Sequence, residues 1–295
     1  MKLTIGFITG RPEPHLDWLL GSLAPQLAPK DEITVLVIDA LGRTPTALGA
    51  HPYGNLIPRV VVALPKPTPW QGRHRITSCD WWAKSSAINT ALVLCETDYV
   101  AFLDDSCRLG PKWLETVREG ERKRRSVLAG TYEKIEQGVV TPDHRRISAP
   151  KGKSNCGGGW LFGCTFALPL EWALEANGAE EGCDGMGTED YIFGFMLENN
   201  GHRIDFVPDM AVTQVRDEAL ISGIPRSGLR RTDKGISPHD KSHAALARFR
   251  HRKRTEFSPD LRALRAQRAA GVLSWPLPDP KMRDWYDGQL VREMK

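Results

Sequence analysis

The sequence lacks any long hydrophobic run. Its longest stretch without a charged residue, Ser154–Leu170, has 17 residues but includes four glycines and a proline. Such a composition favours a loop followed by a strand over a membrane-spanning helix. The N-terminus has no signal-peptide core, because a strand-like segment over 3–8 begins almost at once. We therefore expect a cytoplasmic protein without a transmembrane segment.

Paired cysteines are also missing. There is no CxxC pair and no ladder of short spacings among the six cysteines, which are Cys79, Cys95, Cys107, Cys156, Cys164 and Cys183. This excludes a disulfide framework and a structural zinc site, and predicts reduced thiols. A hydrophobic content of 41% and a charged content of 26% are those of an ordinary globular protein.

The net charge of +4 hides an uneven distribution of charge. Residues 226–268 contain 13 Lys and Arg against 4 Asp and Glu, a difference of +9. Such a segment fits contact with a phosphorylated ligand, anionic lipid headgroups or nucleic acid. Only Phe249 and Phe257 interleave with the cations, which weakens the nucleic-acid interpretation. A solvated basic helix face is the plainer alternative.

Strands and helices alternate along the chain, which predicts an α/β fold with a mostly parallel sheet flanked by helices. The run 33–38 is apolar throughout, as is typical of a parallel strand covered on both faces. There is no internal repeat and no clear linker, so we expect one domain over 1–215 and a basic C-terminal extension over 216–295. The expected strands are 3–9, 33–38, 60–64, 99–103, 127–132, 160–168 and 204–207, and the expected helices are 17–27, 81–95, 112–125, 169–177 and 189–200.

Two adjacent carboxylates, Asp104 and Asp105, follow the apolar run 99–103. Ligands bind at the carboxyl ends of strands in open α/β sheets. Like charges side by side cost energy unless a cation or donors share them, so the pair suits a divalent metal and a diphosphate. The alternative is a strand end whose Asp caps the next helix. Asp39 ends the strand 33–38 and should lie at the same sheet edge.

A second acidic pair stands at the expected start of the helix 189–200. Thr188 is a natural N-cap, which places Glu189 and Asp190 in the first turn, where the helix dipole favours carboxylates. An Asp held there is suited to accept a proton from an attacking hydroxyl. Acids are common at helix starts, so a capping role alone is the alternative. Lys84 and Asn89 lie on the helix before the acidic strand, where Lys84 is placed to reach a phosphate and Asn89 to brace a loop.

Five segments in this order resemble glycosyltransferase family 2 and its relatives with the GT-A fold: TIGFITGRP, VLVIDA, KSSAINTAL, YVAFLDDSCRLGPKWLE and GTEDYIFGFMLENNGHRIDFVP. The resemblance covers about residues 3–215. It implies a GT-A (Rossmann-like) sheet, with a nucleotide-sugar half over about 1–110 and an acceptor or catalytic half over about 111–215. The basic extension, 216–295, would pack over the active site.

The resemblance also implies roles for single residues. Asp190 would be the general base of an inverting transfer, and Glu189 would orient the acceptor. Asp104, Asp105 and Ser106 would form the metal motif that holds Mn²⁺ or Mg²⁺, with Asp105 bridging the metal and the phosphates. The remaining nucleotide-sugar contacts would be Thr9, Gly10, Arg11 and Asp39 at the base and ribose, and Lys84 near the uridine or diphosphate. Apart from the resemblance, Trp160, Trp81 and Trp82 offer flat apolar faces for stacking on the sugar, with a place in the core as the alternative expected for at least one of them.

The chain departs from the family pattern at three places. Ser106 takes the third position of the metal motif and is a weaker ligand for a hard cation. The family's VDDGS-like loop is IDALG here. Where relatives often carry a metal-binding histidine after the last strand, this chain has Gln214. His239 and His243 are the nearest candidates to supply that ligand.

We therefore expect an inverting, metal-dependent glycosyltransferase. It would move a hexose-type sugar from a nucleoside-diphosphate donor, with uridine as the favoured base, to a hydroxyl acceptor. Two alternatives stay open. A nucleotidyltransferase that makes sugar nucleotides uses a similar sheet, although GRPEPH has little of the required triphosphate loop. A non-catalytic sugar or nucleic-acid binding module is the other alternative, and peripheral contact with an anionic surface is a further expectation for the basic segment.

Overall fold

The N-terminal half of the chain builds four parallel strands in the computed structural model, which describes residues 1–48, 59–68, 83–184, 188–215 and 247–276. In spatial order they are β3 (Arg59–Ala63), β2 (Glu32–Asp39), β1 (Lys2–Thr9) and β4 (Tyr99–Asp104). Their side chains alternate between two buried layers, as expected for parallel strands covered on both faces. The apolar runs in the sequence are therefore explained by this double burial.

The second half of the sheet is mixed. β8 (Thr165–Pro169) runs antiparallel between β4 and β6 (Val127–Glu136), and β9 (Ile204–Val215) runs parallel to β6. The described strands form one sheet in the order β3-β2-β1-β4-β8-β6-β9-β5, with β5 (Cys107–Leu109) at the edge and β7 (Val139–Pro142) paired to β6 as a hairpin. The register of β6 against β9 shifts around Gly130, where an added Cβ would lie 2.3 Å from the carbonyl oxygen of Met210.

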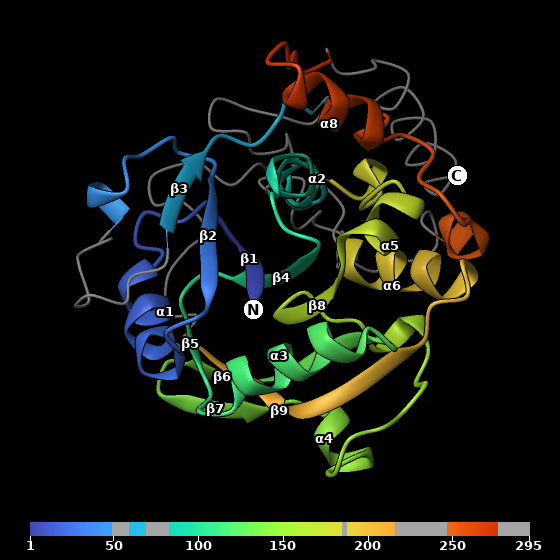
Figure 1. The fold of residues 1–295 in the computed structure, drawn as a ribbon. Helices are drawn as coiled ribbons and strands as arrows, with labels where there is room; N and C mark the ends of the chain where they lie inside the picture. Colours follow the sequence, from blue (N-terminus) through green and yellow to red (C-terminus); the bar gives the residue numbers. More distant parts are fainter. Residues whose placement is uncertain (49–58, 69–82, 185–187, 216–246, 277–295) are drawn as a thin grey trace, which may run out of the picture.

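Helices cover both faces of this sheet (Figure 1). α1 (Leu16–Leu23) and α3 (Trp113–Lys123) pack on one face, and α2 (Lys84–Leu94), α5 (Leu170–Glu175) and α6 (Glu189–Asn199) on the other. The shorter described helices are α4 (Arg145–Ser148) and the 3₁₀ turns η1 (Ala24–Gln26), η2 (Thr46–Leu48), η3 (Gly158–Trp160), η4 (Glu181–Cys183) and η6 (Ala247–His251).

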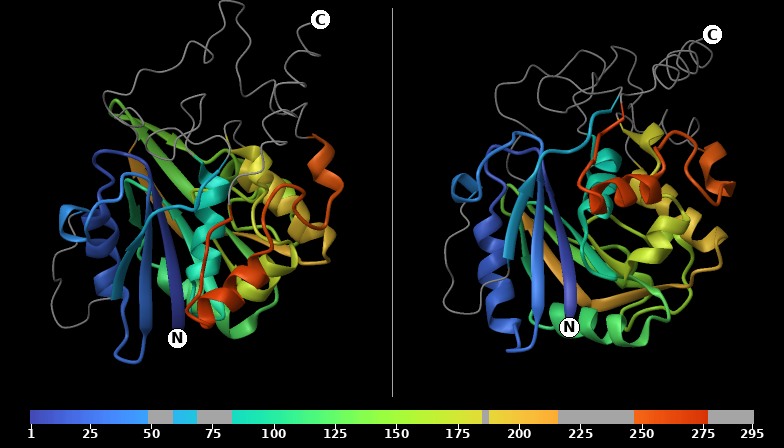
Figure 2. Two further views of the ribbon diagram at one scale, coloured as in Figure 1. Left: turned by 90° about the horizontal axis from the view of Figure 1, so that it is seen from above. Right: turned by 45° about the horizontal axis from the view of Figure 1, so that its top comes forward.

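The described part of the C-terminal extension, 247–276, lies along the helical layer that contains α2, α5 and α6 (Figure 2). Phe249 and two leucines of α8 (Leu261–Ala269), Leu261 and Leu264, are buried in the same apolar cluster as α2. The carboxylate of Glu180 accepts hydrogen bonds from the backbone N–H groups of Glu256 and Phe257. This stretch is therefore built into the core of the fold. The segments 216–246 and 277–295 lie outside the described residues.

The predicted α/β fold with a mostly parallel sheet is confirmed, and each predicted strand and helix has a counterpart in the described chain. The largest differences concern β9, which continues to Val215 beyond the predicted end at 207, and β8, which begins at Thr165 because 160–164 forms a loop. The strands β5 and β7, the helices α4 and α8 and the 3₁₀ turns η2, η3, η4 and η6 were not predicted. Within the described ranges no helix has the length and apolarity needed to cross a membrane.

The five cysteines in the described part of the chain are all free thiols.

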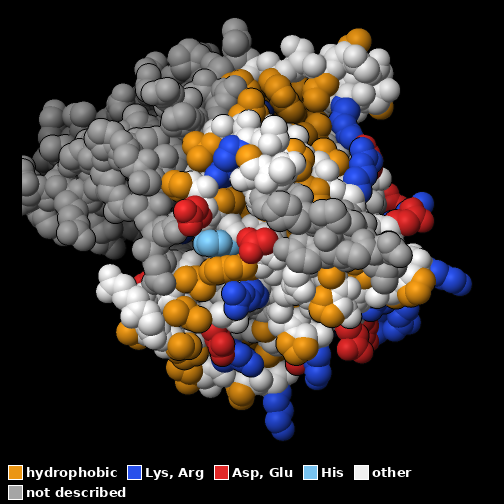
Figure 3. Space-filling model, turned by 90° about the vertical axis from the view of Figure 1, so that its left-hand side faces the viewer, with side chains coloured by type: hydrophobic (Ala, Val, Ile, Leu, Met, Phe, Trp, Pro, Cys, Tyr) orange, Lys and Arg blue, Asp and Glu red, His pale blue; other side chains and the backbone are white. Residues whose placement is uncertain are grey.

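The side of the molecule at the left of Figure 1 carries acidic, basic and hydrophobic side chains interspersed among its described atoms (Figure 3). No field of a single sign of charge is therefore present on that described surface.

Candidate active site

The carboxyl ends of β1, β2 and β4 bring the predicted acids to one edge of the sheet. Thr9 is in register with Asp39 across β1 and β2, and Ile8 is in register with Asp104 across β1 and β4. Because these strands are parallel, their polar ends lie side by side, where α/β sheets bind ligands. The predicted co-location of Asp39 with Asp104 and Asp105 is confirmed.

Asp105 is enclosed by its partners. One carboxylate oxygen accepts a hydrogen bond from the Thr9 hydroxyl at 2.8 Å, and the other accepts from Nε of Arg11 at 2.9 Å. Burial raises the pKa of Asp105, although Arg11 and Thr9 act in the opposite direction. Asp105 is thus a buried, paired carboxylate that ties β4 to the end of β1.

Asp39 is closed in the same way. Its oxygens accept hydrogen bonds from Nε and Nη2 of Arg43, at 3.0 and 2.9 Å, and from backbone N–H groups of Leu41 and Arg43. Arg43 also donates to the carbonyl oxygen of Pro12. A bidentate guanidinium pair of this kind fixes the loop after β2. Asp39 reaches the base or ribose of a nucleotide only if these contacts rearrange.

Lys84, the first residue of α2, stands at the centre of a group of carboxylates. Its Nζ lies 2.7 Å from Oδ1 of Asp104 and 3.3 Å from Oε1 of Glu189. Burial opposes the charge of the ammonium group, but Asp104, Glu189 and Asp190 together raise the pKa of Lys84 well above its ordinary value. Burial raises the pKa of Glu189, which Lys84 offsets in part. The structure therefore joins the predicted cation and both predicted acidic pairs in one site.

Asp190, at the start of α6, is held by two backbone amides. Gly163 N–H donates to Oδ2 at 2.6 Å, and Tyr191 N–H donates to Oδ1 at 2.7 Å. These bonds fix the orientation of the carboxylate. Gly163 belongs to the loop 160–164, and a Cβ added to it would lie 2.4 Å from Nζ of Lys84. A glycine at this position therefore lets the ammonium group sit beside Asp190.

The N-terminal end of α6 differs from the prediction. Thr188 is the N-cap residue of α6, but it adopts a left-handed conformation with φ of 67° and its side chain makes no capping hydrogen bond. The prediction of a side-chain cap was wrong, because the buried Thr188 hydroxyl has no hydrogen-bond partner among the described residues.

At α2, the backbone N–H groups of Ser85 and Ser86 donate to the carboxylate of Asp184 at 2.8 and 3.2 Å. A helix N-terminus is a natural anion site, and here a buried Asp fills it. Burial and the nearby Glu181 raise the pKa of Asp184 well above its ordinary value.

Asn89 braces a loop, as predicted. Its side-chain oxygen accepts from Ala179 N–H at 2.8 Å, and its amide nitrogen donates to Ala179 O and to Oε1 of Glu181, both at 2.9 Å. Glu181 in turn pairs with the buried Lys66 at 2.5 Å. These contacts anchor the stretch that leads to Asp184.

The groups around the metal motif are of mixed kinds. Ser106 has a left-handed backbone with φ of 52°, and its N–H donates to the carbonyl oxygen of Pro14. Nε2 of Gln214 lies 3.4 Å from Oδ2 of Asp104 and from the carbonyl oxygen of Asp105. Within the described ranges, no cluster of three or more His, Cys, Asp or Glu side chains is arranged to hold a metal ion. His239 and His243 lie outside those ranges.

Trp160 and Gly10, two further residues predicted for the nucleotide-sugar site, make contacts other than those of the Lys84 cluster. The Trp160 ring packs against Phe206 with centroids 5.4 Å apart, and Nζ of Lys153 lies 4.8 Å from its centre. Gly10 directly follows β1 and is buried beside Thr9. Trp81 and Trp82 lie outside the described residues.

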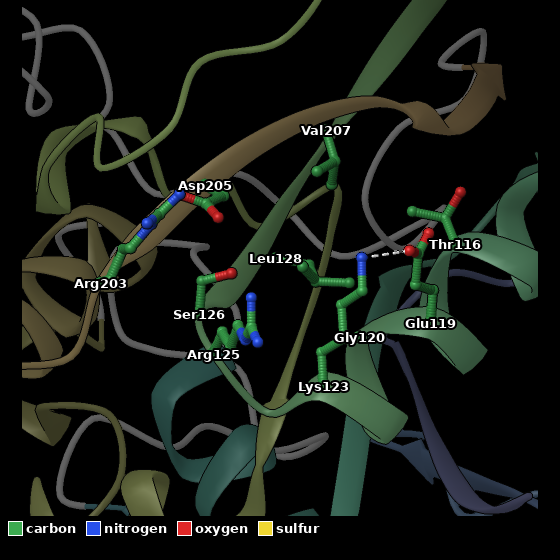
Figure 4. A pocket seen from close by; sticks show the side chains of 10 residues that line it. All are labelled: Thr116, Glu119, Gly120, Lys123, Arg125, Ser126, Leu128, Arg203, Asp205 and Val207. Carbon is green, nitrogen blue, oxygen red and sulfur yellow. Dashed lines mark hydrogen bonds and ion pairs between the residues drawn. The ribbon is translucent and has the colours of Figure 1, made fainter.

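A surface pocket of about 280 Å³ lies between α3 and the N-terminal ends of β6 and β9, at the edge of the sheet opposite to the acids (Figure 4). Its charged side chains are largely paired, Lys123 with Glu119 and Arg203 with Asp205. None of the predicted site residues lines it, so we assign it no role. The lining residues are Thr116, Glu119, Gly120, Lys123, Arg125, Ser126, Leu128, Arg203, Asp205 and Val207.

Sequence reasoning missed three parts of the site, which are Gly163, Arg43 and Asp184. Gly163 acts through its backbone N–H, which leaves no mark in the sequence beyond the glycine itself. Arg43 stands four residues after Asp39, a spacing that signals an ion pair only once the turn between them is known. Asp184 caps a helix that lies 98 and 99 residues earlier in the chain, so no local pattern reveals it.

Comparison with known proteins supports the fold. No family model matches the chain, and no curated protein matches it. Among solved structures, S. aureus TarS 1-349 in complex with UDP is 21% identical, with a TM-score of 0.52 over 73% of this chain and 61% of that chain. The same protein in complex with UDP-GlcNAc is 20% identical, with a TM-score of 0.51 over 74% and 60%.

A third similar structure, GalNAc-T7 with UDP, GalNAc and Mn²⁺, is 14% identical, with a TM-score of 0.54 over 84% of this chain and 48% of that chain. The matches therefore span less than two thirds of the length of these proteins. At such identities the likeness establishes a shared fold, and the GT-A architecture expected from the sequence is confirmed.

Proposed function

We propose that this chain is a glycosyltransferase that takes its sugar from a nucleoside-diphospho-sugar, with UDP as the carrier, and inverts the anomeric configuration. The observation that carries the proposal is the cluster in which Lys84 joins the carboxylates of Asp104 and Glu189 beside the oriented Asp190. The cluster lies at the carboxyl edge of a GT-A sheet, the place where this architecture binds ligands. The names of the similar structures, which include UDP and UDP-GlcNAc, support the choice of donor.

Asp190 is the proposed general base. Its carboxylate is oriented by two N–H donors and still has lone pairs with which to accept a proton from an acceptor hydroxyl. That hydroxyl attacks the anomeric carbon from the face opposite the nucleotide. The bond to the acceptor oxygen forms as the bond to the diphosphate breaks, and the proton passes to Asp190. Glu189, paired with Lys84, would hold the acceptor or the ammonium group in place.

Charge balance bears on the proposed metal. Within the described part of the chain, the five carboxylates Asp39, Asp104, Asp105, Glu189 and Asp190, when ionised, face three cations, Arg11, Arg43 and Lys84. A diphosphate adds further negative charge, so it requires added cations. Mn²⁺ or Mg²⁺ would supply them and would stabilise the departing diphosphate. The Mn²⁺ in the similar GalNAc-T7 structure is consistent with this need.

The residues present fit such an ion at Asp104. This carboxylate contacts Nζ of Lys84 at 2.7 Å and Nε2 of Gln214 at a longer 3.4 Å, whereas both oxygens of Asp105 accept short hydrogen bonds from Arg11 and Thr9. Carboxylate oxygens are the ligands that hard divalent cations prefer. We therefore propose Asp104 as the carboxylate ligand of the ion, in place of Asp105, which the resemblance assigns to the metal together with Ser106. His239 and His243 remain proposed ligands from outside the described residues.

Two assays separate this function from its alternatives. The protein is incubated with UDP-sugars and Mn²⁺, and the release of UDP is measured. A transferase should hydrolyse the correct donor slowly without an acceptor, and a binding module should show only a shift in melting temperature. A free ligand concentration of 100 times Kd raises the free energy of unfolding by about 2.7 kcal/mol. Release of pyrophosphate from UTP and a sugar phosphate would instead identify a nucleotidyltransferase. The proposal would be contradicted if the protein turned over no donor and no nucleotide stabilised it.

A further inference from the structure

The loop 160–164 connects the two acidic parts of the site. Gly163 N–H donates to Asp190, and the carbonyl oxygen of Cys164 accepts from Asp104 N–H at 3.3 Å. A small displacement of this loop would therefore move the proposed base relative to the acid that we assign to the metal. Whatever fixes the loop also fixes the catalytic geometry.

One end of the loop is fixed by α6. Gly158, in the turn η3, packs so closely on this helix that an added Cβ would lie 2.4 Å from the backbone nitrogen of Phe195. The remaining support comes from the other side of the loop, where Arg145 of α4 lies beneath it.

Arg145 contacts the loop with its whole guanidinium group. Nη1 donates to the carbonyl oxygen of Trp160, and the centre of the group lies 3.9 Å from the ring centre of Phe162. Nη2 donates to the carbonyl oxygen of Gly130 at 2.6 Å, which ties the same group to β6. Lysine has no planar fork, so it cannot make these contacts together.

Asp143 holds Arg145 in this position. Its carboxylate accepts from Nε at 3.0 Å and from Nη2 at 2.6 Å, and it also accepts from the Thr131 hydroxyl at 3.1 Å. Arg145 is 3% exposed and Asp143 is 0% exposed. A buried ion pair seldom adds net stability compared with apolar residues of the same volume. Stability alone therefore does not explain why this pair is present.

We propose that Arg145, held by Asp143, is a positioning residue for the reaction. It sets the loop 160–164 so that the Gly163 amide meets Asp190 and leaves space for the ammonium group of Lys84. The proposal rests on the proposed function, because it assigns Asp190 as the base. Arg145 itself touches neither the substrate nor the reacting atoms. Its effect reaches the site through the contacts at Trp160 and Phe162.

The first test measures turnover and stability together. Arg145→Met should lower kcat about 10²-fold, the scale of a small misplacement of catalytic groups, and leave the donor KM within about twofold. It should also destabilise the fold, because Asp143 is left buried without its cation. The double variant Asp143→Asn/Arg145→Met removes that charge and should regain most of the melting temperature while kcat stays low. If kcat recovers together with stability, the pair is structural and the proposal is wrong.

Arg118→Met is a control at an Arg–Asp pair remote from the site, in which the arginine side chain is 36% exposed. It breaks another Arg–Asp pair, with Asp31 at 2.8 Å, which stands before β2 at the opposite end of the sheet. The control should lose stability and keep kcat. A loss of kcat in Arg118→Met equal to that in Arg145→Met would also overturn the proposal, because any destabilisation would then suffice.

A second test needs no turnover. In protein labelled with ¹⁵N-glycine, the Gly163 amide signal is assigned by its loss in Gly163→Ala, and its proton shift reports the hydrogen bond to Asp190. The signal should move upfield in the Arg145 double variant and stay unchanged in Arg118→Met. An unchanged signal in the double variant would contradict the positioning role. If the wild-type protein turns over no donor, the proposed function fails, and this test still decides the link between Arg145 and Asp190.

Discussion

Two parts of the same sheet edge treat their carboxylates differently. At the ends of β1 and β2, Asp39 and Asp105 each have a guanidinium partner of their own. Around the starts of α2 and α6, by contrast, Asp104, Glu189 and Asp190 share the single ammonium group of Lys84. Asp104 and Asp105 are neighbours in the sequence, yet they belong to different parts.

The difference separates architecture from chemistry. A carboxylate in a one-to-one ion pair with an arginine is neutralised and held in a fixed orientation. Such a pair fixes a loop and attracts a further cation only weakly. Among the described residues, three carboxylates that share one ammonium group carry excess negative charge when ionised, which favours a ligand cation and a proton acceptor. The comparison therefore predicts that substitutions among the carboxylates around Lys84 affect turnover and metal response. Substitutions in the Arg11–Asp105 and Arg43–Asp39 pairs should chiefly affect stability.

The largest effect should come from Asp190→Asn. The variant loses the proton acceptor, so kcat should fall about 10²–10⁴-fold. One of the two N–H donors that now face the carboxylate would meet an amide nitrogen, which costs about 1 kcal/mol of stability. Steady-state kinetics and donor titration by calorimetry measure the two effects, and donor affinity should be kept.

Glu189→Gln is the matched control for that variant, because Glu189 is the neighbouring acid in the same turn and shares Lys84. It should lose less turnover than Asp190→Asn. Wild-type kcat in Asp190→Asn, with a large loss in Glu189→Gln, would transfer the role of the base to Glu189.

The sequence was sufficient to predict which acids meet at this edge of the sheet, and that Lys84 and Asp190 belong to the site. The strand ends carry their acids after continuous apolar runs, so their meeting at one edge follows from parallel pairing alone. Lys84 and Asp190 were identified from motif order and from the first turn of a helix. Both signals are local in the sequence, and local signals survive without knowledge of tertiary contacts.

The division between the two parts was not predictable, because it depends on long-range geometry. Asp105 meets Arg11 across 94 residues of sequence, and Asp190 meets Gly163 across 27. Nothing in the dipeptide Asp104-Asp105 says which carboxylate turns toward Arg11 and which toward Lys84. The loop 160–164 was likewise assigned to a strand, since its composition is apolar and its support comes from Arg145.

An intermediate effect should separate Asp104 from Asp105. Asp104→Asn removes the carboxylate that we assign to the metal, so the tightening of UDP binding by Mn²⁺ should fall about 10–100-fold. Asp105→Asn should keep that tightening and should lose stability instead, because Arg11 is left without its buried anion. Calorimetric titration of UDP with and without Mn²⁺ tests both variants. The opposite result, with metal response lost only in Asp105→Asn, would restore the assignment expected from the sequence.

The smallest effect concerns the pH dependence of stability and the helix cap Asp184. Burial raises the pKa of Asp184 well above 3.8, so the folded protein binds its proton more tightly than the unfolded chain does. The stability that this provides is fully present below pH 3.8 and is lost as the pH rises through the raised pKa. Asp105, Glu180 and Glu189 also have raised pKa values, which act in the same direction.

The melting temperature should therefore fall between mildly acidic and neutral pH, a trend opposite to that produced by salt-bridged surface acids. Asp184→Asn resembles the protonated form at every pH and should therefore make the fall of the melting temperature with pH less steep. Thermal melts of both proteins at a series of pH values make the comparison. Equal slopes would mean that Asp184 keeps its charge when folded, and that the N-terminus of α2 stabilises this carboxylate enough to outweigh its burial.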